Sequence, residues 1–315
     1  MNSNMLNENK NNFFLAIDGG GTKTTVWIAD ESGNVLGRAT TGPMSLAATT
    51  EALAMEHFMT AISEAVEHLD VAGFSQVVVG LAGVDTDEEI ADAYRIFSTA
   101  LHERFSFLNF KVVNDIVIAL ASGSTSPNTI CLISGTGSNC YGRNEQGETA
   151  KTGGMDYLLS DQGSGFEIGQ QVLRAAVKSF DGRSKKTMIE ELVCQHFFIE
   201  SISQLKDKVY HPLLNKTQIG QLSQICFAAK EQHDAIANEI IAASIEELVE
   251  MVVTVMKRLH LTKKLTDVVL IGGIATDPVV HIQLEARLLT HFSQIKLIVP
   301  AHPPVYGALQ LALQK

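Results

Sequence analysis

Two glycine-rich turns in matching surroundings constrain the fold of this chain more than any other feature. Residues 15–23 read LAIDGGGTK and residues 130–139 read ICLISGTGSN, so each time an apolar strand runs into several glycines before a second strand. Glycine is costly inside regular structure, so such clusters indicate tight turns. A further turn, ESGN or NEQGE, then precedes a third short strand. The pattern predicts two related three-stranded meanders.

Matching segments also recur downstream of each meander. Residues 75–88, SQVVVGLAGVDTDE, are similar to residues 266–279, TDVVLIGGIATDPV, because each is an apolar strand, a glycine turn and an acidic helix start. Residues 110–115 parallel residues 295–300, and an apolar helix candidate follows each. Strands alternating with helices after a meander are typical of α/β proteins. We therefore predict two duplicated α/β domains, each a mixed sheet flanked by helices, with one large doubly wound sheet as the alternative.

The predicted domains cover residues 1–120, of which 1–12 form a disordered tail, and residues 121–315. The second domain is larger because it holds a mostly helical insertion, and the last helix is expected to pack back on the first domain. A cleft between the two halves is the expected ligand site. Amphipathic periodicity predicts helices over 48–69, 87–103, 170–180, 186–197, 219–230 and 235–258.

Composition excludes several classes of function. The chain has 315 residues, is 45% hydrophobic and carries a formal net charge of −11 without a Lys/Arg cluster, which argues against a nucleic-acid partner. No apolar stretch approaches the ~18 residues of a membrane span. The four cysteines lack metal-ligand spacing and read as reduced thiols. We expect a soluble cytoplasmic protein.

The glycine turns have the composition of phosphate cradles. Backbone N–H groups in such turns can converge on a phosphate oxygen, and the missing side chains let the anion approach. A plain hairpin is the alternative for either turn alone, and no GxGxxG opens a helix to suggest a Rossmann site. The residues predicted to bind a nucleoside polyphosphate are Gly20, Gly21, Thr22, Lys23, Gly135, Thr136, Gly137, Gly272 and Gly273.

Three aspartates accompany these turns. Asp115 ends an apolar strand and is a candidate general base, with a helix N-cap as the alternative. Asp18 would face the phosphates, where a carboxylate needs an intervening cation, so Mg²⁺ is expected beside it; an Asx-turn is the alternative. Asp161 precedes a helix and could cap it, accept hydrogen bonds from hydroxyl groups of a ligand, or do both.

The ordered set AIDGGGTKT, VVND, LISGTGSNC, LLSDQGSG and LIGGIA resembles the actin–hexokinase–Hsp70 ATPase superfamily. Within it the chain is similar to the N-acetylglucosamine kinase and glucosamine kinase group of the BadF/BadG/BcrA/BcrD ATPase family, from Phe13 to about Leu313. The resemblance implies two actin-like (ribonuclease H-like) ATPase domains with ATP and sugar bound in the cleft between them.

The resemblance also implies roles by position. Thr22 and Thr136 match phosphate-contacting threonines, Gly272 and Gly273 match the adenosine motif, and Asp115 matches the carboxylate that contacts the sugar and acts as base. The implied sugar-binding residues are Ser45, Asp115, Ser138, Asn139, Gly154, Met155, Asp156 and Asp161.

Two positions depart from the family pattern. Ser45 stands where the family has a sugar-binding Asn, and residues 153–157 read GGMDY where N-acetylglucosamine kinases have GGWGH. A carboxylate at Asp156 could attract the ammonium of glucosamine, whereas a solvent-facing Asp156 would leave the sugar open.

The resemblance therefore implies an ATP-dependent kinase, with Mg²⁺, for the 6-hydroxyl of N-acetylglucosamine, glucosamine or both, and a homodimer. One alternative is an activator ATPase of the same family, which would hold an iron–sulfur cluster through paired cysteines. The other is a sugar sensor without turnover, which the candidate base Asp115 argues against.

Overall fold

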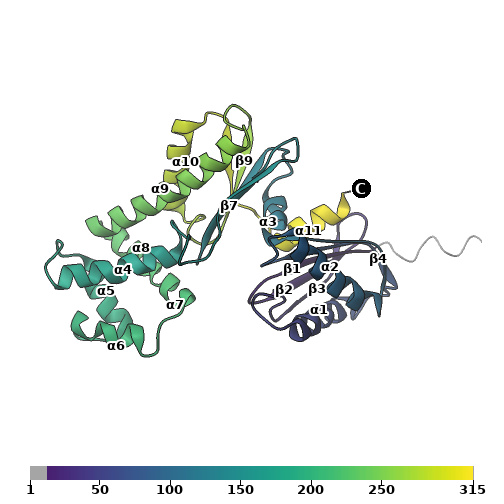
Figure 1. The fold of residues 1–315 in the computed structure, drawn as a ribbon, viewed down its shortest axis with the longest axis horizontal. Helices are drawn as coiled ribbons and strands as arrows, with labels where there is room; N and C mark the ends of the chain where they lie inside the picture. The colour runs from purple at the N-terminus through teal and green to yellow at the C-terminus, as the bar shows by residue number, and fades with distance from the viewer. Residues whose placement is uncertain (1–12, 315) are drawn as a thin grey trace, which may run out of the picture. The chain divides into compact units, whose positions relative to one another are not determined.

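Two separate five-stranded sheets form the framework of the chain (Figure 1). The computed structural model describes residues 13–314, so the predicted tail 1–12 lies outside the described residues. The chain divides into unit 1, residues up to 125 with those from 300 onward, and unit 2, residues 126–299. The sequence-based boundary lay at 120/121, and the C-terminal segment that returns to unit 1 includes the last helix.

Unit 1 contains an antiparallel meander extended by two parallel strands. Its sheet has the order β3-β2-β1-β4-β5, in which β4 and β5 run parallel to β1. The predicted glycine turn joins the first two strands. The strands are β1 (Phe13–Gly19), β2 (Thr24–Ala29), β3 (Val35–Thr41), β4 (Gly73–Leu81) and β5 (Ser106–Asn114).

Helices cover both faces of this sheet because its central strands are apolar on both sides. One face of β1, including Leu15 and Ile17, packs in the same core as buried side chains of α1 (Glu51–Val66) and α2 (Asp87–His102). The other face, including Ala16, packs with α3 (Asp115–Gly123) and α11 (Pro304–Leu313). The predicted helices over 48–69 and 87–103 are confirmed. The first begins three residues later because Thr50 caps it, the second begins at the predicted Asp87 after the cap Thr86, and both end earlier than predicted.

Unit 2 repeats the same sheet plan. Its order β10-β9-β6-β7-β8 again has an antiparallel meander and two strands parallel to the first of the three. Two sheets of equal topology confirm the duplicated α/β fold and exclude the single doubly wound sheet. The strands are β6 (Thr129–Ser134), β7 (Ser138–Arg143), β8 (Thr149–Gly153), β9 (Thr266–Ile271) and β10 (Ile295–Ile298).

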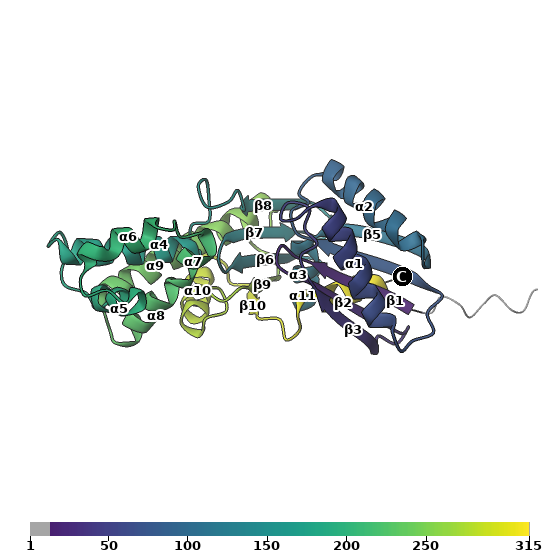
Figure 2. The same cartoon turned by 90° about the horizontal axis from the view of Figure 1, so that it is seen from below.

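A helical insertion between β8 and β9 enlarges unit 2. The long α9 (Ala235–Arg258) packs on the sheet, and in two views α5 and α6 lie at the end of the unit away from its strands (Figures 1 and 2). The predicted helix over 219–230 is wrong in its bounds, because the chain bends at Leu222 and forms two short helices. The remaining elements are α4 (Gly165–Phe180), α5 (Met188–Phe197), η1 (Ile202–Gln204), α6 (Leu205–Tyr210), α7 (Lys216–Gln221), α8 (Ser223–Glu231) and α10 (Pro278–His291).

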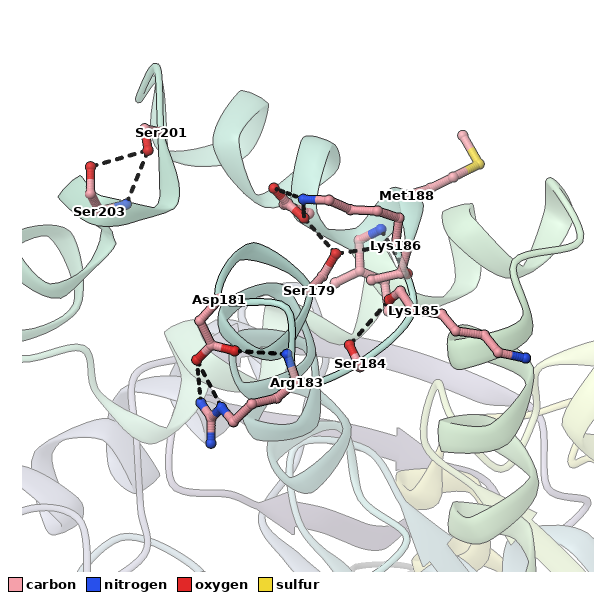
Figure 3. A network of polar contacts seen from close by, with 12 residues as sticks. Ser179, Asp181, Arg183, Ser184, Lys185, Lys186, Met188, Ser201 and Ser203 are labelled. Atoms are coloured by element: carbon pink, nitrogen blue, oxygen red, sulfur yellow. Dashed lines mark hydrogen bonds and ion pairs between the residues drawn. The ribbon is translucent and has the colours of Figure 1, made fainter.

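Polar contacts hold the connection between α4 and α5 (Figure 3). Ser179 near the end of α4 donates a hydrogen bond to Glu190 of α5, and Lys186 pairs with the same carboxylate at 2.9 Å. Arg183 folds back on Asp181 at 2.6 Å. These contacts join the first two helices of the insertion.

Among the helices of residues 13–314, none combines the length and apolar character that crossing a bilayer demands.

Candidate functional site

The first glycine turn is tight and open to solvent. The Gly20 N–H donates to the carbonyl of Lys23 at 2.9 Å, which closes the turn between β1 and β2. Gly21, Thr22 and Lys23 are exposed, whereas Ser45 is buried and its N–H donates to the Gly20 carbonyl at 3.2 Å. The predicted phosphate residues of unit 1 and Ser45 therefore lie next to one another, with the turn's backbone accessible.

Asp18 and Asp115 lie at the same end of the unit 1 sheet. Asp18 pairs with Gly80 in the register of β1 and β4, Gly80 pairs with Val113 of β5, and Asp115 follows two residues later. Burial raises the pKa of Asp18 to about 6, with a smaller contribution from the Asp115 charge, while Lys23 acts in the opposite direction. Two nearby carboxylates, one of them partly desolvated, make a donor set that fits Mg²⁺, which prefers one or two carboxylates together with substrate oxygens.

Asp115 is held by the residue before it. The N-cap of α3 is Asn114, whose Oδ1 accepts from the Ile116 N–H at 2.9 Å, so the N-cap interpretation of Asp115 is wrong. The Asn114 amide also donates to the Val84 carbonyl at 2.9 Å. Asn114 thereby ties the end of β5 to the loop after β4, and Asp115 occupies the first helical position.

In unit 2, a cavity of about 550 Å³ brings two of the predicted glycine motifs together. Gly135 and Thr136 come from the turn after β6, and Gly273 comes from the turn after β9. The remaining lining residues come from α4, α7, α8, the turn after β9 and the loop before α10: Gly165, Gly220, Gln221, Ser223, Gln224, Phe227, Ala228, Glu231, Ile274 and Asp277. The cavity has the size of a small-molecule site.

The adjacent Gly272 and Gly273 differ in whether a side chain could be accommodated at their positions. Gly272 has φ +93°, and a Cβ there would lie 2.4 Å from the Ser134 carbonyl oxygen. That oxygen accepts from the N–H groups of Ile274 and Ala275, so the close approach joins the two turns. A Cβ on Gly273 would meet no atom within 4 Å. Gly272 is thus required by the fold, whereas Gly273 leaves bare backbone beside the cavity.

Asp161 supports the second glycine turn. Its Oδ1 accepts from the Ser138 N–H at 3.0 Å, and a Cβ on Gly137 would lie 3.0 Å from either carboxylate oxygen. Asp161 does not cap α4, because Ser164 is the N-cap. The buried carboxylate therefore sits directly beneath the turn, which explains the glycine at position 137.

Asp161 and Asp156 share one cation that sequence reasoning missed. The ammonium of Lys216, the first residue of α7, lies 2.7 Å from Asp161 Oδ2 and 2.5 Å from Asp156 Oδ1. It also lies 5.8 Å from the centre of the Tyr157 ring. Hydrogen bonding and the charge of Lys216 lower the pKa of Asp156. Nothing in the local sequence around Lys216 marks it, because its partners lie about 60 residues upstream.

The predicted sugar residues of the β7–β8 region also converge. The Gly154 N–H donates to the Ser138 carbonyl at 3.2 Å, and a Cβ on Gly154 would lie 3.1 Å from Asn139 Cβ. Asn139 Oδ1 is buried and, within residues 13–314, accepts no hydrogen bond. A buried acceptor of this kind is suited to a ligand hydroxyl. The Met155 side chain is 67% exposed, so most of it packs against no other part of the protein.

The predicted residues therefore form one set in each unit. Unit 1 holds the first turn, Asp18, Ser45 and Asp115, and unit 2 holds the second turn, the glycine pair and the loop from Gly154 to Asp161. Sequence reasoning missed the contribution of α7 and α8, including Gln224 and Phe227, to the cavity. Their amphipathic pattern could not reveal it, because it resembles ordinary helix packing.

Three kinases of amino sugars are similar to this chain in sequence. An N-acetylmuramic acid/N-acetylglucosamine kinase of Clostridium acetobutylicum is 29% identical over 303 residues, covering 95% of this chain and 98% of the relative. An N-acetyl-D-glucosamine kinase of Dictyostelium discoideum is 27% identical over 313 residues, covering 95% and 97%. A glucosamine kinase of Vibrio cholerae is 28% identical over 188 residues, covering 59% of this chain and 62% of the relative.

Solved structures share the fold. A Chromobacterium violaceum protein, provisionally assigned as an N-acetylglucosamine kinase, superposes with a TM-score of 0.73 at 19% identity, covering 96% of this chain and 99% of that one. A glucokinase of the ROK family from Streptomyces griseus gives a TM-score of 0.55 at 16% identity, covering 96% and 100%. Residues 15–312 match the BadF/BadG/BcrA/BcrD ATPase family as a whole. With nearly the entire chain matched and the glycine motifs of unit 2 gathered at one cavity, this protein belongs to the BadF/BadG/BcrA/BcrD ATPase family.

Proposed function

We propose that this protein is an ATP-dependent amino-sugar kinase that phosphorylates the 6-hydroxyl of N-acetylglucosamine. The single observation that carries the proposal is the cavity in unit 2, which Gly135, Thr136 and Gly273 line although they are far apart in the sequence. The relatives matched over 95% of the chain are named as kinases of N-acetylated amino sugars, which supports the substrate class.

The nucleotide is assigned to this cavity. Its bare backbone at Gly273 would admit the flat face of an adenosine, and the Phe227 side chain adds apolar surface. The turn containing Thr136 would direct N–H and hydroxyl groups to phosphate oxygens. In unit 1 the exposed turn of Gly20 to Lys23 offers a second set of such donors.

Asp115 is assigned as the general base that accepts the proton of the sugar hydroxyl. Phosphoryl transfer needs an oriented nucleophile and a neutralised γ-phosphate more than covalent chemistry. Asn114 holds Asp115 at the start of α3, which suits the orienting part of that task. Asp18 is assigned to hold Mg²⁺, which would supply charge neutralisation.

The sugar is assigned to Asn139, Gly154 and Asp161, because Asn139 Oδ1 and the Asp161 side chain are buried and Gly154 lies next to Asn139. The hypothesis that Asp156 attracts the ammonium of glucosamine requires a free carboxylate. Lys216 already pairs with Asp156, so the structure does not support this hypothesis. A neutralised carboxylate gives no advantage to a charged amine over a neutral acetamide. N-acetylglucosamine is therefore the preferred candidate, with glucosamine as the alternative.

The activator alternative is not supported by the thiols. Cys131, Cys140 and Cys226 are buried, and burial raises the pKa of Cys140 and Cys226, the latter to about 12. Ligands of an iron–sulfur cluster are thiolates. A cluster shared between subunits needs ligands at the protein surface, where Cys131, Cys140 and Cys226 do not lie.

A coupled ADP-release assay over N-acetylglucosamine, glucosamine, N-acetylmannosamine and glucose tests the proposal. N-acetylglucosamine should stimulate ADP release well above the rate without sugar, and NMR of the product should place phosphate on the oxygen of C6. If no sugar stimulates ADP release, the kinase assignment fails. If glucosamine is the better substrate, the kinase stands and the choice of sugar is wrong.

A further inference from the structure

We propose that Lys216 is a positioning residue that clamps the loop of residues 154–160 to the second glycine turn and thereby sets the affinity for the sugar. The inference about affinity rests on the proposed function, whereas the clamp itself does not. The juxtaposition that carries it is one ammonium between two carboxylates, that of Asp156 within the loop and that of Asp161 directly after it.

The two carboxylates differ in their surroundings, and this decides what Lys216 does. The Asp161 side chain is only 4% exposed, whereas that of Asp156 is 67% exposed. An exposed ion pair alone contributes little to stability. A charge as buried as Asp161 requires a partner, so Lys216 is anchored at Asp161. Asp156 then attaches the tip of the loop to that anchor.

Asp161 transmits this anchoring to the glycine turn. Its other oxygen accepts from the Ser138 N–H at 3.0 Å, and the Ser138 hydroxyl donates to the Gln162 carbonyl at 2.6 Å. The Ser138 carbonyl in turn accepts from the Gly154 N–H at the start of the loop. The loop is thus held at one end by backbone contact with β7 and at its tip by Lys216.

The loop depends on this clamp because it has little packing of its own. Leu158 is 81% exposed and Leu159 72% exposed, so these apolar side chains do not anchor the loop in the core. Asp156 has φ +65°, a conformation that costs a non-glycine residue energy and persists only when its surroundings enforce it. The Tyr157 ring lies 4.9 Å from that of Phe166 in α4, which adds one contact near the clamp.

Lys216 also links the loop to the nucleotide side of unit 2. It begins α7, and the other end of this short helix, Gly220 and Gln221, lines the cavity of the proposed nucleotide site. A Cβ on Gly220 would lie 3.2 Å from Thr136 Cγ2. One short helix therefore contacts the phosphate turn at one end and the proposed sugar loop at the other.

The test compares Lys216→Met, Lys216→Arg and Asp156→Asn with a matched control, Lys264→Met. Lys264 forms an ion pair with Glu145 of the same length, 2.7 Å, and its side chain is 37% exposed against 30% for Lys216. The first readout is hydrogen exchange of the peptide covering residues 154–160, which needs no substrate. Its N–H groups at Met155 and Ser160 are hydrogen-bonded within the loop.

Lys216→Met should raise the exchange rate of this peptide at least tenfold and Asp156→Asn about threefold, while Lys264→Met leaves it unchanged. Lys216→Arg should restore protection to within threefold, because a guanidinium can serve two carboxylates. Asp156→Asn guards against misfolding, since that exposed side chain is not needed for the core. Unchanged exchange in Asp156→Asn and in a folded Lys216→Met would overturn the clamp.

The second readout is kinetic. Lys216→Met should raise the KM for N-acetylglucosamine about tenfold, with kcat and the KM for ATP within threefold of wild type, as expected when ground-state and transition-state binding are lost equally. A loosened loop with an unchanged sugar KM would overturn the link to affinity. If the wild type releases no ADP with any sugar, the proposed function fails and the exchange measurement still decides the clamp.

Discussion

Asp18 and Asp115 lie at the same end of the unit 1 sheet, and the charge of Asp115 together with burial raises the pKa of Asp18 to about 6. Gly80 of the intervening strand β4 pairs with Asp18 in the register. A Cβ on Gly80 would lie 2.2 Å from Ile118 Cδ1, so this glycine lets α3 pack directly on the sheet. The placement of Asp115 therefore depends on a glycine far from it in the sequence.

Removing the charge of Asp115 should stop turnover with little effect on binding. Asp115→Asn should lower kcat by about 10²–10⁴-fold, the usual cost of losing a general base, while the KM values for ATP and sugar stay within a few-fold. Steady-state ADP release measures both. Asp92→Asn, on the exposed face of α2, is the control because that carboxylate pairs with Arg95 at the surface. A kcat for Asp115→Asn within threefold of wild type would reduce the residue to a structural role.

The raised pKa of Asp18 predicts how stability depends on pH. Between about pH 3.8 and 6 the folded protein holds a proton that the unfolded chain has lost, so the contribution of Asp18 to stability falls as pH rises through this range. Asp18→Asn removes the charge and should raise the free energy of unfolding by about 1–3 kcal/mol at pH 7. The gain should disappear near pH 4. Thermal unfolding of both proteins at pH 4, 5.5 and 7 checks this, and a gain of equal size at all three values would contradict it.

The same shift predicts an acid limb in the activity of the wild type. In the proposed role of Asp18 as a Mg²⁺ ligand its carboxylate must be ionised, so kcat/KM for ATP should fall as pH drops below about 6. Raising the Mg²⁺ concentration should move this limb to lower pH, because the cation competes with the proton. If the pH of the acid limb does not change with the Mg²⁺ concentration, the titrating group is not Asp18.

The adjacent glycines after β9 should respond in opposite ways to the same substitution. Gly272→Ala places a Cβ 2.4 Å from the Ser134 carbonyl oxygen at φ +93°, so it should lower the melting temperature by several degrees or prevent folding. Gly273→Val adds its side chain to open space beside the cavity and should leave the melting temperature unchanged. It should weaken ATP binding about tenfold or more, measured by calorimetry. Normal ATP affinity in Gly273→Val would remove this glycine from the nucleotide site.

Gly80 and Ile118 should behave as a coupled pair. Gly80→Ala forces Ile118 and α3 away from the sheet, so it should lower both stability and kcat. Ile118→Ala alone leaves a cavity in a fully buried position and should cost about 2–4 kcal/mol. The double variant should be more stable than the sum of the two changes predicts, because each substitution removes part of the other's strain. If the losses in free energy of unfolding, measured by chemical denaturation, are additive, the contact between position 80 and Ile118 does not cause the destabilisation by Gly80→Ala.

The sequence by itself determined the duplicated plan and most of the chemistry-bearing residues. Strand alternation and the glycine turns are local signals, so β1, β2 and β6 and the two cradles could be placed without coordinates. The start of α1 differed by three residues because the cap at Thr50, rather than periodicity, sets where the helix begins. The break at Leu222 was missed because two short helices share one amphipathic pattern.

Only the tertiary structure decided which residues share a site. The shifted pKa of Asp18 comes from burial and a neighbour on another strand, and the cavity of unit 2 joins turns that are distant in the chain. The role of Lys216 could not be predicted for the same reason. A lysine at the start of a helix forms these two ion pairs only when folding brings Asp156 and Asp161 close to it. Local sequence specifies conformation through short-range propensities, whereas desolvation and charge pairing depend on contacts that only packing creates.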